Sequence, residues 1–283
     1  MKIIVDAFGG DHAPEEILLG CAQAMEELGV EILLSGDQKR LESAAAKLNL
    51  SEQLAHMEIL HCSEVLTMED EPASVVKEKA GSSMAVGLKA LAEGKGDAFA
   101  SAGNSGALVV GATTIVKRIR GVRRVSFAPI LPKFEGFFML NDGGANVDCR
   151  PEMLLQFGIM GSAYMKKVMG IENPRVGLAN VGSEDHKGDE LRQEALALLR
   201  ACPSIRFVGN VEARDIPYDA ADVVVADGFT GNMMLKLYEG VAMAVMDKMK
   251  GVFQKSLLNK LAASVVYGDM KACLLYTSDA ADE

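Results

Sequence analysis

A strand, a glycine-rich turn and the start of a helix follow one another at least five times along this chain, and no other feature limits its fold as strongly. In the clearest case the apolar run of residues 221–226 leads into the turn 227–232, with the sequence DGFTGN, and a helical pattern opens at Met233. Strands that alternate with helices in this way predict a mostly parallel sheet with helices on both faces. The length of 283 residues suits one large α/β domain or two smaller lobes.

The turn 227–232 has the properties of an anion-binding site. Backbone N–H groups at the start of a helix lack partners within the helix, and the helix dipole favours negative charge there. Thr230 and Asn232 add side-chain donors. The structural alternative is a tight turn in which glycine supplies backbone angles that other residues avoid.

Four further turns repeat the arrangement, at residues 5–14, 97–107, 141–146 and 176–188. Each carries glycine beside Asp, Asn, Ser or Lys. In an open α/β sheet such turns gather at the carboxyl ends of the strands, where ligands bind. We therefore expect the turns to build a binding site for a small anionic ligand.

The net charge of −10 argues against general nucleic-acid binding, which needs a basic surface. One segment is strongly basic, however, and we call residues 117–124 the basic segment. Its five cations are Lys117, Arg118, Arg120, Arg123 and Arg124. They predict either a helix C-terminus whose cations complement the dipole, or a docking site for an acidic partner.

Five cysteines without a CxxC pair or zinc spacing predict reduced thiols in the cytosol. The first residues enter a strand directly, so we expect no targeting segment. No stretch approaches the roughly 20 apolar residues that a membrane span needs. Residues 240–266 combine apolar residues at helical spacing with lysines. They predict either a core or dimer-facing helix, or a helix that binds a membrane surface or partner.

Six motifs in the same order resemble one family. They are residues 6–11 (DAFGGD) with Pro14, 101–107 (SAGNSGA), 142–149 (DGGANVDC) with Pro151 and Glu152, 174–178 (PRVGL) with Lys187 and Gly188, 209–216 (GNVEARDI), and 227–232 (DGFTGN). Together they resemble the bacterial phosphate acyltransferase family, the PlsX-type acyl-ACP:phosphate transacylases of phospholipid synthesis. The resemblance covers residues 1 to 272.

This resemblance implies a three-layer α/β sandwich like that of isocitrate and isopropylmalate dehydrogenases and phosphotransacetylases. The fold would have a mostly parallel sheet and a helical C-terminal extension, in a homodimer. The implied reaction is acyl-ACP plus inorganic phosphate giving acyl phosphate plus free acyl carrier protein. The product would feed a membrane glycerol-3-phosphate acyltransferase. The resemblance implies no metal, nucleotide or other cofactor. It also implies a cytoplasmic enzyme that associates only peripherally with the inner face of the membrane.

The resemblance also assigns roles to residues. Lys187 and Asn232 match the leading candidates for catalysis, and Asn104 is a further catalytic donor. The predicted phosphate- and substrate-binding residues lie in the turns and are Asp6, Gly9, Gly10, Asp11, Ser101, Gly103, Ser105, Gly106, Asp142, Asn146, Asp227, Gly228, Thr230 and Gly231. For the four aspartates the alternative role is to cap helices or hold turns. The basic segment would dock the acidic carrier protein.

Several alternatives stay open. Cys149, next to Arg150, could accept the acyl group, but no histidine is paired with it, so direct attack by phosphate is preferred. His12 and His186 lie in site turns and are candidate proton carriers. The functional alternatives are a phosphotransacetylase-like enzyme that uses acyl-CoA, a dehydrogenase of related fold, and a remnant that only binds acyl carrier protein or membrane.

The sequence departs from the family pattern mainly at its end. Met153 replaces a histidine that commonly follows Pro-Glu, and Phe8 replaces a methionine. Residues 273–283 match nothing in the family pattern, and we expect them to be a non-native tail on a truncated chain. The predicted catalytic domain is therefore 1–272, with an incomplete helical dimer and membrane-surface region at 240–272.

Overall fold

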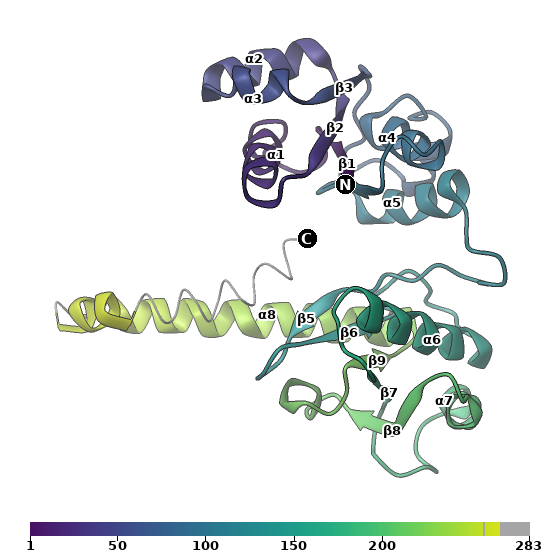
Figure 1. The fold of residues 1–283 in the computed structure, drawn as a ribbon. Helices are drawn as coiled ribbons and strands as arrows, with labels where there is room; N and C mark the ends of the chain where they lie inside the picture. Colours follow the sequence, from purple (N-terminus) through teal and green to yellow (C-terminus); the bar gives the residue numbers. More distant parts are fainter. Residues whose placement is uncertain (257, 267–283) are drawn as a thin grey trace. The chain divides into compact units, whose positions relative to one another are not determined.

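The computed structural model describes residues 1–256 and 258–266 and divides into two compact units. The first unit is Met1–Gly121 and the second begins at Val122. Of the two arrangements that the length of 283 residues allows, the chain therefore has two smaller lobes (Figure 1). The predicted tail 273–283 and the end of the 240–272 region lie outside the described residues.

The first unit is built on a four-stranded parallel sheet with the order β3-β2-β1-β4. Its strands are β1 (Lys2–Asp6), β2 (Glu31–Gly36), β3 (Glu58–His61) and β4 (Ala98–Ala100). Its helices are α1 (Glu15–Leu28), α2 (Gln38–Leu48), α3 (Ser51–Ala55), α4 (Ser83–Ala92) and α5 (Ser105–Gly111), with the short helical turns η1 (Pro72–Val76) and η2 (Ala112–Val116).

Helices cover both faces of this sheet because its strands are apolar on both sides. Leu18 of α1 and Leu41 of α2 pack with Leu34 on one face. On the other face Ala90 of α4 packs with Ile4 and Leu33. The unit therefore has three layers, with helices on either side of the sheet (Figure 1).

The second unit has a five-stranded sheet with the order β5-β6-β9-β7-β8. Its strands are β5 (Ile130–Pro132), β6 (Phe137–Asn141), β7 (Arg175–Asn180), β8 (Arg206–Glu212) and β9 (Val223–Val225). All neighbours run parallel except the β5–β6 pair. The unit's helices are α6 (Pro151–Lys167), α7 (Glu190–Ala201) and α8 (Gly228–Phe253), with the short turn η3 (Ile216–Tyr218).

The central strand β9 shows why this sheet is also covered on both faces. Val223 and Val225 pack with Phe157 of α6 and Leu199 of α7. The intervening Val224 packs on the opposite face with Leu235 of α8. A strand buried on both sides reads as a continuous apolar run, which is how residues 221–226 appear in the sequence. The predicted α/β fold class is confirmed.

Helix α8 differs from the prediction at its start. It begins at Gly228 rather than Met233, so the glycine-rich turn is the first turn of the helix itself. Gly231 explains the glycine, because a Cβ at this position would lie 1.9 Å from the carbonyl oxygen of Asp142. Farther along, residues 239–250 are all exposed, and residues 258–266 are helical again. Among the described residues, none of the helices combines the length and apolarity that crossing a bilayer requires.

Candidate functional site

Three loops meet at one edge of the sheet in the second unit. Strands β6, β9 and β7 are adjacent and parallel, and Asn141 pairs with Val225 at their carboxyl ends. The loops that follow carry Asp142 after β6, Asp227 after β9 and Lys187 after β7. This edge is where ligands bind in open α/β sheets, so the predicted gathering of these turns is confirmed within this unit.

Asp227 is the N-cap of α8. Its Oδ1 accepts hydrogen bonds from the N–H groups of Phe229 (3.1 Å) and Thr230 (3.0 Å), and its Oδ2 accepts one from Thr230 Oγ1 (2.7 Å). Burial raises the pKa of Asp227, but the hydrogen bonds from Thr230 and the charge of Arg192 outweigh burial, and the pKa is lowered from its ordinary value.

The backbone N–H groups at the start of α8 are therefore already occupied, which corrects the prediction that they are free for an anion. The N–H of Gly228 donates to the carbonyl oxygen of Asn146 at 2.7 Å, and the next two N–H groups bond to Asp227. The N–H of Gly231 donates to the backbone carbonyl of Asp227 at 2.8 Å. An anion at this helix start must be held by side chains.

Asp142 organises the loop after β6. It is 0% exposed. Its Oδ1 accepts from the N–H groups of Phe127 (2.8 Å), Gly144 (3.2 Å) and Ala145 (3.1 Å). Its Oδ2 accepts from the backbone N–H (2.7 Å) and the Nδ2 (2.8 Å) of Asn146. Both oxygens are thus engaged inside the loop, as expected of a turn-holding aspartate.

Arg192 was not identified from the sequence, yet it connects two of the loops. Its guanidinium donates to Asp227 Oδ2, to Thr230 Oγ1 (2.8 Å) and to Asp189 Oδ2 (2.7 Å). The side chain is only 14% exposed. The one local signal is the spacing of Asp189 and Arg192 at the start of α7, where Asp189 is the N-cap. The contact with Asp227 spans 35 residues and leaves no pattern in the sequence.

Lys187 and Asn232 are the predicted site residues with open side chains in this unit. Both are exposed, and neither side chain bonds to any part of the chain that the structure describes. The backbone carbonyl of Lys187 accepts from Asn180 Nδ2 at 3.1 Å, which ties the backbone at Lys187 to the end of β7. Asn232 lies over Gly144, where a Cβ would come 3.4 Å from its Oδ1. The side chains therefore offer one cation and one amide to a ligand.

The first unit holds a second cluster at the adjacent ends of β1 and β4. Ser101 Oγ donates to Asp6 Oδ2 (2.8 Å) and accepts from the N–H of Gly103 (3.1 Å). Gly9 and Gly103 approach closely, because a Cβ on Gly103 would lie 3.1 Å from the Gly9 Cα. Burial raises the pKa of Asp6. Hydrogen bonds from Ser83, Ser101 and the backbone lower the pKa, but by less, so the pKa stays above its ordinary value.

Asn104 is engaged within this unit rather than open to a ligand. It is the N-cap of α5, with Oδ1 accepting from the N–H of Ala107 at 3.0 Å. Its Nδ2 donates to the carbonyls of Thr67 (3.3 Å) and Asp70 (3.1 Å). The remaining predicted residues of this cluster are less buried: Gly10 is half-buried, and Asp11, Ser105 and Gly106 are exposed.

Cys149 lacks the features of an activated nucleophile. Burial raises the pKa of its thiol to about 11, so the thiol is protonated at neutral pH. Its Sγ donates to the carbonyl oxygen of Asn146 at 3.3 Å. His12 and His186, the candidate proton carriers, are both exposed. Within residues 1–256 and 258–266, no three His, Cys, Asp or Glu side chains are grouped to hold a metal ion.

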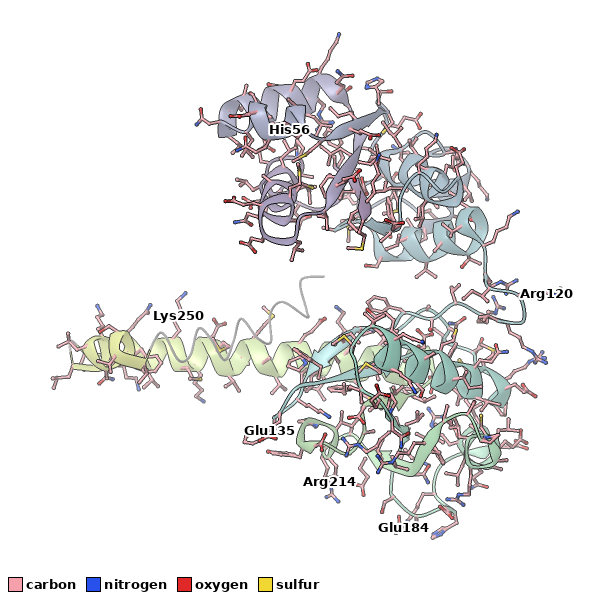
Figure 2. The ribbon with its side chains drawn as sticks, viewed as in Figure 1. His56, Arg120, Glu135, Glu184, Arg214 and Lys250 are labelled. Atoms are coloured by element: carbon pink, nitrogen blue, oxygen red, sulfur yellow. The ribbon has the colours of Figure 1, made fainter. Side chains whose placement is uncertain are left out.

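The basic segment begins at a helix C-terminus, because Lys117 is the C-cap of η2, but its other four cations lie beyond the helix. The π-helical turn η2 ends at Val116, and residues 117–124 contain neither helix nor strand. All five cations are exposed, and the boundary between the units falls inside the segment, after Gly121. Arg120 is labelled on this segment in Figure 2.

Comparison with known proteins shows the family to which this chain belongs. The pattern of the family described as fatty acid synthesis protein matches residues 1–277. "Phosphate acyltransferase" of Acetivibrio thermocellus is 48% identical over 272 residues, which cover 96% of this chain and 79% of that protein. "Phosphate acyltransferase" of Bacillus subtilis is 45% identical over 273 residues, which cover 96% and 80%. This chain belongs to the phosphate acyltransferase family. It is an acyltransferase, and the predicted resemblance is confirmed.

Solved structures of phosphotransacetylases have a fold similar to that of this phosphate acyltransferase. "EutD phosphotransacetylase from Staphylococcus aureus" superposes with a TM-score of 0.64 at 18% identity, covering 86% of this chain and 82% of that chain. A phosphotransacetylase from Streptococcus pyogenes gives a TM-score of 0.62 at 19% identity, with the same coverage. At such low identity these structures show the fold alone, and they confirm the predicted phosphotransacetylase-like architecture.

Proposed function

We propose that this phosphate acyltransferase moves a fatty acyl group from acyl carrier protein to inorganic phosphate. A phosphate oxygen attacks the thioester carbonyl and forms the new C–O bond. The C–S bond breaks, and the carrier thiol leaves with the proton that phosphate gives up. The observation that carries the proposal is the loop edge of the second unit, where Lys187 and Asn232 remain open to a ligand in a chain of this family.

In this reaction Lys187 is the point charge that draws phosphate to the loop after β7. An ammonium group also offsets the negative charge that develops on the carbonyl oxygen. Asn232 is the amide donor across the first turn of α8. Arg192 and Asp227 hold that turn in place, because their ion pair joins the start of α7 to the start of α8.

Direct attack by phosphate is favoured over an acyl-enzyme. A cysteine nucleophile must be a thiolate, and the raised pKa of Cys149 keeps its thiol neutral. Phosphate is already an anion at neutral pH and needs positioning more than activation.

The acyl donor in this proposal is the acidic carrier protein. The enzyme carries a net charge of −10, so an acidic protein is repelled by it as a whole and needs a local basic surface. The exposed basic segment supplies that surface. The acyl phosphate then passes to a membrane glycerol-3-phosphate acyltransferase. In this proposal the enzyme works in the cytoplasm, at the inner face of the membrane. It does so as a homodimer.

The test compares donors for phosphate-dependent release of the free thiol. We expect palmitoyl-ACP to react and palmitoyl-CoA to react far more slowly. Arg120→Glu with Arg124→Glu should lower kcat/KM for palmitoyl-ACP about tenfold at low salt, and the loss should shrink at high salt. Lys39→Glu with Lys47→Glu makes the same charge change on exposed residues of α2 and is the control. Equal or faster reaction of palmitoyl-CoA would instead favour the phosphotransacetylase-like alternative.

A further inference from the structure

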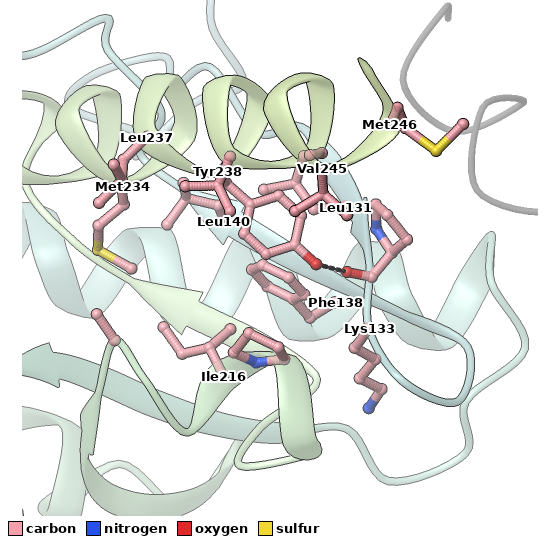
Figure 3. Close-up of a pocket in the computed structure, with 15 residues that line it drawn as sticks. Leu131, Lys133, Phe138, Leu140, Ile216, Met234, Leu237, Tyr238, Val245 and Met246 are labelled. Atoms are coloured by element: carbon pink, nitrogen blue, oxygen red, sulfur yellow. Dashed lines mark hydrogen bonds between the residues drawn. The ribbon is translucent and has the colours of Figure 1, made fainter. Parts of the chain in front are cut away.

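An apolar pocket of about 600 Å³ lies in the second unit between α8, the β5–β6 hairpin and η3 (Figure 3). Its size is that of a small-molecule site. Leu131, Phe138, Leu140 and Ile216 form its floor, and Met234 and Val241 of α8 lie opposite. None of the residues assigned above to the chemistry lines this pocket.

Among the described residues that line the pocket, the two polar side chains, Lys133 and Tyr238, are already engaged. The hydroxyl of Tyr238 donates to the carbonyl oxygen of Pro132 at 2.5 Å. The ammonium of Lys133 pairs with Asp219 and, at 3.0 Å, with Asp222, and its side chain is only 6% exposed. The hydroxyl and the ammonium are therefore both occupied by partners within the chain. Because polar groups determine the orientation and selectivity of polar ligands, this lining selects an apolar occupant.

Helix α8 joins the pocket to the candidate site. Thr230, Met234, Tyr238, Val241 and Val245 follow one another at spacings of three or four residues, so they share one face of the helix. Thr230 contacts Arg192 and Asp227 at the site, and the other four line the pocket. From Met234 to Val245 the pocket follows the helix for roughly 16 Å. It is therefore long, and one end lies a single turn from the site.

We propose that this pocket binds the alkyl chain of the acyl donor, with the thioester at the Thr230 end and the methyl end toward Val245. This inference rests on the proposed function, since an acyltransferase substrate carries such a chain. Met234 and Met246 suit the role, because flexible thioether side chains adapt to chains of different length. A second copy of this protein is the rival occupant, and the test below separates the two.

The test narrows the pocket with Ala242→Phe. Ala242 lines the pocket and is exposed, so a larger side chain enters the pocket without disturbing the core. Ala244→Phe is the matched control, because Ala244 is exposed on the same helix and does not line the pocket. We expect Ala242→Phe to lower kcat/KM for palmitoyl-ACP by about tenfold or more and to leave butyryl-ACP within about twofold. The control should leave both donors unchanged. An equal effect of Ala242→Phe on the two donors, or none, overturns the proposal.

A second measurement separates failure of the pocket from failure of the proposed reaction. Titration with cis-parinaric acid, monitored by its fluorescence, needs no phosphate and no turnover. We expect Ala242→Phe to weaken this binding about tenfold and Ala244→Phe to leave it unchanged. Such binding without any phosphate-dependent turnover would support the pocket and reject the reaction. Turnover together with equal cis-parinaric acid binding by the unsubstituted enzyme, Ala242→Phe and Ala244→Phe would reject the pocket as the site of the alkyl chain. A change in sedimenting mass for Ala242→Phe with unchanged probe binding would show that a second copy fills it.

Discussion

At the scale of single residues, the candidate site separates side chains that are engaged from those that are open. Asp142 and Asp227 direct their carboxylate oxygens to backbone N–H groups, a neighbouring amide, a hydroxyl or Arg192. Lys187 and Asn232 are exposed and keep their polar groups for a ligand. The engaged residues therefore shape the site, and the open ones are expected to touch substrate.

Replacing Asp142 should destabilise the second unit strongly. Asp142→Ala leaves four partly buried loop N–H groups without their acceptor and empties a fully buried site, and we expect it to lower the free energy of unfolding by at least about 3 kcal/mol. Asp148→Ala, at an exposed position six residues along the chain, should change it by less than about 0.5 kcal/mol. Urea unfolding measures both. A small effect of Asp142→Ala would show that its hydrogen bonds do not hold the loop.

Asp6 and Asp227 should affect acid stability with opposite signs. The folded-state pKa of Asp227 is below its ordinary 3.8, so its contribution is complete above pH 3.8 and is lost as the pH falls through the folded pKa. The folded-state pKa of Asp6 is above 3.8, so stability falls as the pH rises from 3.8 through the raised value. We would measure the free energy of unfolding at a series of pH values. Asp227→Asn should remove part of the stability loss that occurs below pH 3.8. Asp6→Asn should remove the stability loss that occurs as the pH rises above 3.8. The same pH profile for both variants would contradict these assignments.

At the scale of elements, helix α8 shows what the sequence predicts and what it does not. The apolar spacing after Met233 predicts the helix, but its first turn contains two glycines, a threonine and an asparagine, which are poor helix formers. The turn is helical because Asp227 caps it and Gly231 packs on the Asp142 carbonyl. These contacts join separate loops, so local sequence patterns do not reveal them. The apolar run 221–226 and the turn after it depend on local patterns, and the sequence predicts both: β9 occupies Val223–Val225 and the turn follows at once.

The glycines of α8 offer a direct test of that packing. Gly231→Ala forces a methyl group against the Asp142 backbone, and we expect it to lower the free energy of unfolding by about 3 kcal/mol. Gly240→Ala has open space around its Cβ on the same helix and should raise stability by about 0.5–1 kcal/mol. Thermal unfolding distinguishes the two. Similar effects from both substitutions would mean that the first turn of α8 does not depend on this close contact.

At the scale of the whole molecule, five turns of one kind fall into two clusters, one in each unit. The sequence predicts that such turns lie at the carboxyl ends of strands, and within each unit they do. It does not show that Asp6 and Ser101 belong to one sheet while Asp142 and Asp227 belong to another, because strand order depends on which apolar faces pack together. Arg192 was missed for the same reason. Only family resemblance selected Lys187 among the chain's many exposed cations.

The most direct test of the central claim is the rate of acyl phosphate formation from palmitoyl-ACP and phosphate by the Lys187→Ala variant. If Lys187 supplies the charge that binds phosphate and stabilises the oxyanion, kcat/KM should fall by about a hundredfold or more. Lys167→Ala, which removes an exposed lysine of α6, should leave the rate unchanged. A Lys187→Ala enzyme as active as the Lys167→Ala control would contradict the account and place the reaction elsewhere in the molecule.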